Sequence, residues 1–155
     1  MFRLRTPRYD EAAILTELCL RSKAAWGYDE EFMQACRAEL TLTASIMRSS
    51  CLKVAEIGGH IVGVAQVTVN GELAELDKLF VEPTRLRSGA GKALFDWATT
   101  VARDGGVLFL TLALSALSLV SGAVADSRGP LPHDGAVDRG CELARHVRLY
   151  RGRHR

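Results

Sequence analysis

Alternating and periodic apolar positions divide the first 112 residues of the chain into strands and helices. Short apolar or alternating runs predict strands over residues 2–5, 52–57, 60–69 and 73–81. Gly58-Gly59 and Asn70-Gly71 separate the last three runs, and two-residue turns of this kind join antiparallel strands. We therefore expect three consecutive antiparallel strands, with residues 73–81 as the central strand.

Helical spacing of apolar residues fills the remaining parts of this region. Asp10, Asp29 and Thr43 are expected to cap three helices that precede the hairpins. The first two helices have apolar stripes of Ile14, Leu15, Leu18 and Cys19, and of Phe32, Met33, Cys36 and Leu40. A later helix carries Leu94, Phe95, Trp97, Ala98 and Val101. This arrangement predicts an α/β domain.

The central strand carries two acidic residues at positions of one face. Strict alternation places Leu73, Glu75, Asp77, Leu79 and Val81 on one face, and Ala74, Leu76, Lys78 and Phe80 on the other. A partly buried carboxylate has a raised pKa and accepts a proton at neutral pH, which suits general-base chemistry on an amine. The alternative is that Glu75 and Asp77 pair with Lys78 or an arginine on a solvated face.

A glycine-rich loop links the central strand to the later helix. Pro83 ends the strand, and Ser88-Gly89-Ala90-Gly91 precedes the helix. Unpaired N–H groups at a helix N-terminus bind anions, and glycine allows a phosphate to approach. Leu94 replaces the third glycine of a dinucleotide fingerprint, and Ala93 follows Gly91-Lys92, unlike a nucleotide P-loop. A phosphorylated cofactor is the predicted occupant, with an ordinary tight turn as the alternative.

Two phrases in this region resemble the GNAT (general N-acetyltransferase) superfamily. Leu79-Phe80-Val81-Glu82-Pro83 matches its strand end, and Leu86-Arg87-Ser88-Gly89-Ala90-Gly91 matches its pyrophosphate loop, except that Leu86 replaces Gln or Arg. The resemblance covers about residues 1–112. It implies a mixed, mostly antiparallel central sheet flanked by helices, and acetyl transfer from acetyl-CoA, without a metal, to a primary amine of a small molecule or peptide.

The resemblance also implies roles for particular residues. It places Glu75 as general base, with Asp77 as second choice. Trp26 and Tyr28 would line the acceptor pocket, and core packing is the alternative for both. Cofactor contacts would come from Leu79, Phe80, Val81, Arg87, Ser88, Gly89, Ala90, Gly91 and Lys92.

The resemblance weakens after Leu112. Residues 107–112 fit the family's next strand, but the tyrosine-containing phrase that follows in the family has no counterpart. Residues 107–125 carry no charge over 19 positions, which meets the length of a membrane span, although a buried strand followed by an apolar helix fits its serines better. Residues 126–155 have the composition of a solvated, poorly ordered tail. One alternative function is therefore a catalytically impaired CoA-binding or interaction protein. A further hypothesis is that a shifted reading frame altered the C-terminus.

Composition and cysteine spacing indicate the number of domains, the partners and the cellular compartment to expect. The 155 residues, 48% of them apolar, suggest a single domain over 1–155. A net charge of +2 gives no reason to expect nucleic acid as a partner. The sequence has four scattered cysteines without the spacing of a metal site, which suggests reduced thiols: Cys19, Cys36, Cys51 and Cys141. The first residues also lack the apolar run of a signal peptide, so we expect a cytoplasmic protein. Many GNAT proteins dimerise, which leaves a homodimer open.

Overall fold

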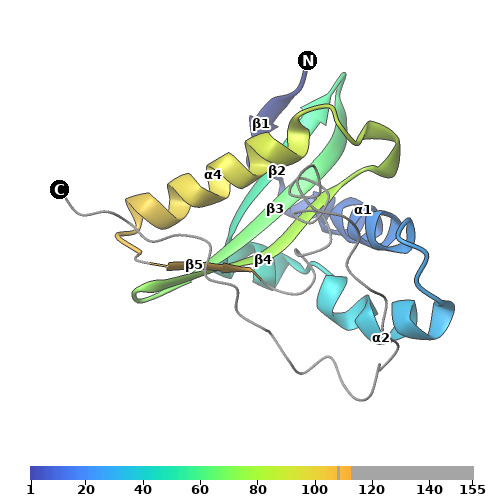
Figure 1. Cartoon of the computed structure of the whole chain (residues 1–155), viewed down its shortest axis with the longest axis horizontal. Helices are drawn as coiled ribbons and strands as arrows, with labels where there is room; N and C mark the ends of the chain where they lie inside the picture. Colours follow the sequence, from blue (N-terminus) through green and yellow to red (C-terminus); the bar gives the residue numbers. More distant parts are fainter. Residues whose placement is uncertain (108, 113–155) are drawn as a thin grey trace, which may run out of the picture.

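The computed structural model describes residues 1–107 and 109–112, which form a sheet with helices on both faces (Figure 1). Five strands run in the order β1–β2–β3–β4–β5; the first four are antiparallel, and β5 is parallel to β4. The strands are β1 (Arg3–Arg5), β2 (Cys51–Ile57), β3 (His60–Asn70), β4 (Leu73–Val81) and β5 (Phe109–Leu112). The expected mixed, mostly antiparallel sheet is confirmed.

Helices occupy the two long connections of this sheet. Between β1 and β2 lie the 3₁₀ turn η1 (Tyr9–Glu11) and the helices α1 (Ala12–Ala24), α2 (Glu30–Leu40) and α3 (Ala44–Ser49). Between β4 and β5 lie η2 (Pro83–Arg85) and α4 (Ala90–Asp104). In Figure 1, α4 crosses one face of the sheet, whereas α1 and α2 lie on the other side.

Each face of the sheet is buried against its own helices. The α4 side holds an apolar cluster of Ala55, Val62, Ala65, Val67, Ala74, Leu76, Leu79, Ala90, Leu94, Ala98, Ala102, Val107 and Leu110. The α1/α2 side holds Leu15, Leu18, Cys19, Leu20, Cys36, Leu40, Leu42, Met47, Leu52, Val54, Val64 and Phe80. Ile14 was expected among the latter but is 56% exposed, because it lies on the outer face of α1.

Two of the three expected helix caps are confirmed. The Asp29 carboxylate accepts the Phe32 N–H at 2.8 Å, and the Thr43 hydroxyl accepts the Ile46 N–H at 3.2 Å. The prediction for Asp10 is wrong, since Asp10 lies inside η1 and pairs with the Arg8 guanidinium. The helix α1 instead begins after Glu11, whose carboxylate accepts the Arg8 N–H.

Both expected hairpins are present. Gly58 and Gly59 have φ values of +57° and +84°, a combination that a tight hairpin between twisted strands requires. The second turn differs by one residue from the prediction. Asn70 pairs with Leu73, so the turn consists of Gly71, at φ +60°, and Glu72.

The central strand β4 contains a bulge that interrupts the alternation. Pairing with β3 passes from Gln66–Lys78 to Val67–Leu76, which leaves Asp77 as an extra residue. Leu76 and Leu79 therefore both pack on the α4 side, and the predicted division of β4 into two alternating faces is wrong. Glu75, Asp77, Lys78 and Phe80 all belong to the α1/α2 side, as their partners on β3 and Phe80's place in that cluster indicate.

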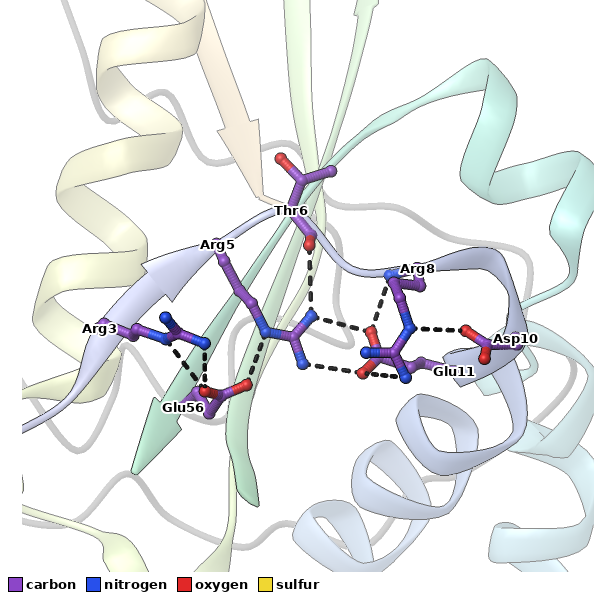
Figure 2. A network of polar contacts seen from close by, with 7 residues as sticks. All are labelled: Arg3, Arg5, Thr6, Arg8, Asp10, Glu11 and Glu56. Atoms are coloured by element: carbon purple, nitrogen blue, oxygen red, sulfur yellow. Dashed lines mark hydrogen bonds and ion pairs between the residues drawn. The ribbon is translucent and has the colours of Figure 1, made fainter. Parts of the chain in front are cut away.

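A network of ion pairs ties the N-terminal edge of the sheet to the first helix (Figure 2). Figure 2 shows the Arg5 guanidinium between two carboxylates. It donates to Glu11 at 2.9 and 2.8 Å and to Glu56 at 2.6 Å, and Arg3 also contacts Glu56. The hydrogen bond from Arg5, above all, lowers the pKa of Glu11 to about 2. The strand β1 is thereby held to both β2 and the start of α1.

Within residues 1–107 and 109–112, no helix combines the length and apolar character that crossing a bilayer requires. Most of the uncharged run at 107–125 and all of residues 126–155 lie outside the described residues. The expectations for those segments, including the membrane span and the tail, stay predictions. The part of residues 107–112 that is described confirms the expected parallel strand.

Candidate functional site

The expected strand, glycine loop and helix follow one another in the structure. The strand β4 ends at Val81, Pro83 opens η2, and the Ser88 N–H donates to the Arg85 carbonyl at 3.3 Å. Gly89 then caps α4 at a φ of +85°, a left-handed conformation that side chains other than glycine rarely adopt. The sequence therefore needs glycine at this point to turn the chain into the helix.

The start of α4 has the geometry of an anion site. The first backbone hydrogen bond of the helix runs from the Ala93 N–H to the Gly89 carbonyl at 3.0 Å, and the N–H groups before it have no helical acceptor. The Ala90 N–H makes a long contact of 3.4 Å with Ser88 Oγ. Together with the helix dipole, these N–H groups favour a bound negative charge.

Close packing places this loop against the end of β4. A Cβ added to Gly91 would lie 3.4 Å from Val81 Cγ2, so glycine allows the helix start to contact the strand. Arg87 has a φ of +64°, which is uncommon for a residue with a side chain and is typical of functional loops. The side chains of Arg87 and Arg85 are exposed, whereas the Lys92 ammonium pairs with Asp96. Two exposed arginines thus lie in or beside the loop.

Two carboxylates lie together upstream in the same strand. Thr68 on β3 pairs with Glu75, and its hydroxyl donates to Asp77 Oδ2 at 2.6 Å. Burial raises the pKa of Asp77, and the negative charges of Glu75 and Glu39 raise it further, against the lowering effects of the Thr68 hydrogen bond and Lys78. The bulge therefore positions a proton-accepting group whose pKa is shifted toward neutrality.

Trp26 and Tyr28 are not part of the core. Trp26 is 47% exposed and Tyr28 is 42% exposed, because both lie in the connection from α1 to α2. The Tyr28 ring stacks on Phe32 with a centroid distance of 4.5 Å. A groove of about 440 Å³ runs between the two helices, lined by Leu20, Arg21, Ala24, Tyr28, Glu30, Met33, Gln34 and Arg37. Tyr28 lines this groove, and Trp26 is not among its lining residues.

An ion pair connects the groove to the end of the central strand. Arg21 of α1 lines the groove, and its guanidinium contacts the Glu82 carboxylate at 2.9 and 3.3 Å. Glu82 directly follows Val81, which contacts the glycine loop. The pair lies at the surface and contributes about 0.2–1 kcal/mol, so its main consequence is to position these two elements.

The structure brings most of the predicted site residues to β4 and the loop after it. Leu79, Phe80 and Val81 are buried, and the β4–β5 pairing in the described residues ends before them, at Leu76–Leu112. Sequence reasoning missed Thr68 as a partner of Asp77, and it missed the burial of Lys78 and Gln66. A lysine inside the apolar run of β4 was the available signal, although alternation placed it on the wrong face. In the described residues no cluster of His, Cys, Asp or Glu has the makings of a metal site.

Comparison with known proteins adds family and fold information. A model of the acetyltransferase (GNAT) family matches residues 15–119. No curated protein has a detectably similar sequence.

Three solved structures illustrate the likeness of the fold. The PaiA N-acetyltransferase of Thermoplasma acidophilum, in complex with coenzyme A, is 17% identical, with a TM-score of 0.68 over 87% of this chain and 94% of its own. The ribosomal-protein-S18-alanine N-acetyltransferase of Escherichia coli is 18% identical, with a TM-score of 0.58 over 82% and 77%. A GNAT-family acetyltransferase of Brucella melitensis, in complex with acetyl-CoA, is 22% identical, with a TM-score of 0.53 over 73% and 75%.

Proposed function

Because the chain belongs to the acetyltransferase (GNAT) family, we propose that it transfers an acetyl group from acetyl-CoA to a primary amine of a small molecule or peptide. The observation that carries this proposal is the loop between β4 and α4, where Gly89 at φ +85° leads into a helix start whose first N–H groups have no helical partner. The raised pKa of Asp77 in the same strand supplies the second requirement, a base.

The loop would hold the diphosphate of acetyl-CoA through its backbone. The main-chain N–H groups from Arg87 to Lys92 are the donors. Gly89 supplies the left-handed turn that leads into the helix start, and Gly91 allows this start to lie against Val81. Leu86 stands where the family has a polar side chain, which leaves the backbone donors unaffected. The pantetheine arm would follow the main chain of Leu79, Phe80 and Val81, beyond the described pairing with β5.

The carboxylates on the α1/α2 side of β4 would prepare the acceptor. An alkylamine is protonated at neutral pH, and its nitrogen attacks a thioester only after a proton is removed. We propose Asp77 for this role ahead of Glu75, because Thr68 orients Asp77 and burial raises its pKa. Acetyl-CoA supplies the activated acetyl group. The nitrogen forms a bond to the carbonyl carbon, the carbon–sulfur bond breaks, and the thiolate leaves with the electron pair.

The acceptor would enter beside α1 and α2. Tyr28 lines the groove between these helices, and Trp26 lies in the same connection, so both stay proposed contacts. The buried thiols of Cys19 and Cys36 are unpaired, which agrees with a reducing compartment such as the cytoplasm. A homodimer remains a prediction from the family.

Calorimetric titration with acetyl-CoA, together with release of free thiol in the presence of an amine panel, tests the proposal. Binding at one site per chain with amine-dependent thiol release is the expected result. Binding without release from any amine would favour the alternative, a CoA-binding or interaction protein that lacks turnover. Absence of both binding and release would overturn both functions.

A further inference from the structure

Two buried polar side chains face each other on the α1/α2 side of the sheet without a partner among the described residues. Lys78 and Gln66 are each only 5% exposed and form a directly paired position of β3 and β4. No ion pair within 4.0 Å and no hydrogen bond from residues 1–107 or 109–112 reaches the Lys78 ammonium, and Gln66 Oε1 accepts no hydrogen bond. Groups buried in this way are unfavourable unless a partner arrives.

The neighbouring groups do not neutralise this ammonium by direct contact. Cys19 lies close to Lys78, but burial raises the pKa of its thiol to about 12, so the thiol is neutral. Asp77 acts on Lys78 through space, while its carboxylate is engaged by the Thr68 hydroxyl. The site therefore combines a largely buried lysine side chain, with no ion pair among the described residues, and one buried hydrogen-bond acceptor without a donor.

We propose that Lys78 and Gln66 recognise a carboxylate-bearing amine as the acceptor of the acetyl group. The Lys78 ammonium binds the carboxylate through one N–H and, through another, donates a hydrogen bond to Gln66 Oε1, which holds the ammonium in place. This inference rests on the proposed acetyltransferase function and names the substrate class of that site. Charge recognition of this kind discriminates between acceptors, because an acceptor without the carboxylate leaves the ammonium unpaired.

The spacing along β3 indicates the separation of amine and carboxylate. Gln66, opposite Lys78, and Thr68, which holds Asp77, are two residues apart on the same face. At about 3.4 Å per residue the two positions are separated by about 7 Å. An acceptor that spans them has several bonds between its nitrogen and its carboxylate, as in 4-aminobutyrate, rather than the single intervening carbon of an α-amino acid.

A matched pair of acceptors tests this inference in the full chain. We expect kcat/KM for 4-aminobutyrate to exceed that for n-butylamine by about 10-fold or more. Lys78→Met should abolish this preference, so that the kcat/KM values for 4-aminobutyrate and n-butylamine measured in that variant agree within about 2-fold, on the same principle of lost pairing. Lys53→Met, the same change on β2, is the control and should keep the preference. Equal values in the wild type, or an unchanged preference in Lys78→Met, overturn the inference but not the acetyltransferase function.

Binding provides a readout that does not depend on turnover. Titration with N-acetyl-4-aminobutyrate should give a measurable Kd for the wild type and for Lys53→Met, and a Kd weakened by about 10-fold or more for Lys78→Met. Gln66→Leu, which leaves the lysine in place, should also weaken it and serves if Lys78→Met does not fold. Binding by the wild type without thiol release from any amine would remove the proposed function and keep this site. Lack of binding by the wild type would overturn the site.

Discussion

At the scale of single residues, the chemistry depends on the environment of one carboxylate. Asp77 is the extra residue of the β4 bulge, and its side chain accepts the Thr68 hydroxyl. Burial and the nearby charges of Glu75 and Glu39 shift its pKa upward. A raised pKa brings the proton affinity of a carboxylate closer to that of the amine it must deprotonate.

Replacing Asp77 tests its role as base. Asp77→Asn should lower kcat by about 10²–10⁴-fold, the range of general-base contributions, and leave the Kd for acetyl-CoA unchanged. The rate of thiol release gives kcat, and calorimetry gives the Kd for acetyl-CoA. Glu75→Gln is the companion variant, for which we expect a smaller loss of kcat. The opposite order of the two effects would restore Glu75, the first choice from sequence, as the base.

The hydrogen bond from Thr68 predicts a shift in the pH profile. This bond lowers the pKa of Asp77, so Thr68→Val should raise that pKa further. The acidic limb of kcat/KM should then move to higher pH, because a larger fraction of Asp77 is protonated at each pH below neutrality. Thr99→Val, which changes an exposed hydroxyl on α4, is the control. A limb that stays in place in Thr68→Val would mean that Asp77 does not control this limb.

At the scale of elements, the turn from β4 into α4 depends on the conformation of Gly89. Gly89→Val places a branched side chain at φ +85°, where it is strained, and should weaken acetyl-CoA binding by at least about 10-fold. Calorimetry measures the affinity, and circular dichroism checks the fold. Gly71→Val introduces similar strain at φ +60° in the β3–β4 turn and should leave the affinity unchanged. Equal affinities of Gly89→Val and wild type would remove the loop assignment.

The elements that the sequence predicts well are those that local chemistry determines. The tight hairpin after β2 requires positive φ values, which Gly58 and Gly59 adopt readily. The side chains of Asp29 and Thr43 accept hydrogen bonds from N–H groups three residues later. Asp10 has the same residue type but loses the cap position, because Arg5 and Arg8 engage Glu11 and η1 starts the helix early. These ion pairs link residues three and six positions apart, which the capping pattern alone does not take into account.

The bulge in β4 marks where prediction of the site fails. Period-two alternation assumes one residue of β4 for each residue of β3, and Asp77 breaks that count. Lys78 was consequently assigned to the face opposite Glu75, although both belong to the α1/α2 side. The glycine loop could be predicted because positive φ demands glycine, whereas the burial of Gln66 and Lys78 follows from tertiary packing, which alternation along one strand does not show.

At the scale of the whole molecule, the ion-pair network of Figure 2 joins the N-terminal edge strand to β2 and to the start of α1. Arg5 on the short edge strand β1 connects Glu56 on β2 with Glu11 before α1. The Glu11 side chain is 6% exposed, so removing one partner leaves a buried charge unpaired. This network therefore determines how the stability of the molecule depends on acid.

The lowered pKa of Glu11 predicts loss of stability at low pH. A carboxylate whose pKa falls from 4.5 unfolded to about 2 folded contributes its full stability above pH 4.5 and loses it as the pH approaches 2. Glu11→Gln should lower the free energy of unfolding at pH 7 by about 3 kcal/mol and flatten its decline between pH 5 and pH 2.5, as expected for a shift of this size. Urea denaturation at several pH values measures both effects.

Asp10→Asn is the matched control for this prediction, because the side chain of Asp10 is 74% exposed and also pairs with Arg8. An exposed pair contributes about 0.2–1 kcal/mol, so this variant should follow the acid decline of the wild type. If Glu11→Gln and wild type declined in parallel, the acid sensitivity would arise at another group. The backbone pairing of β1 with β2, and not the ion pairs of Arg5, would then hold β1 to the sheet.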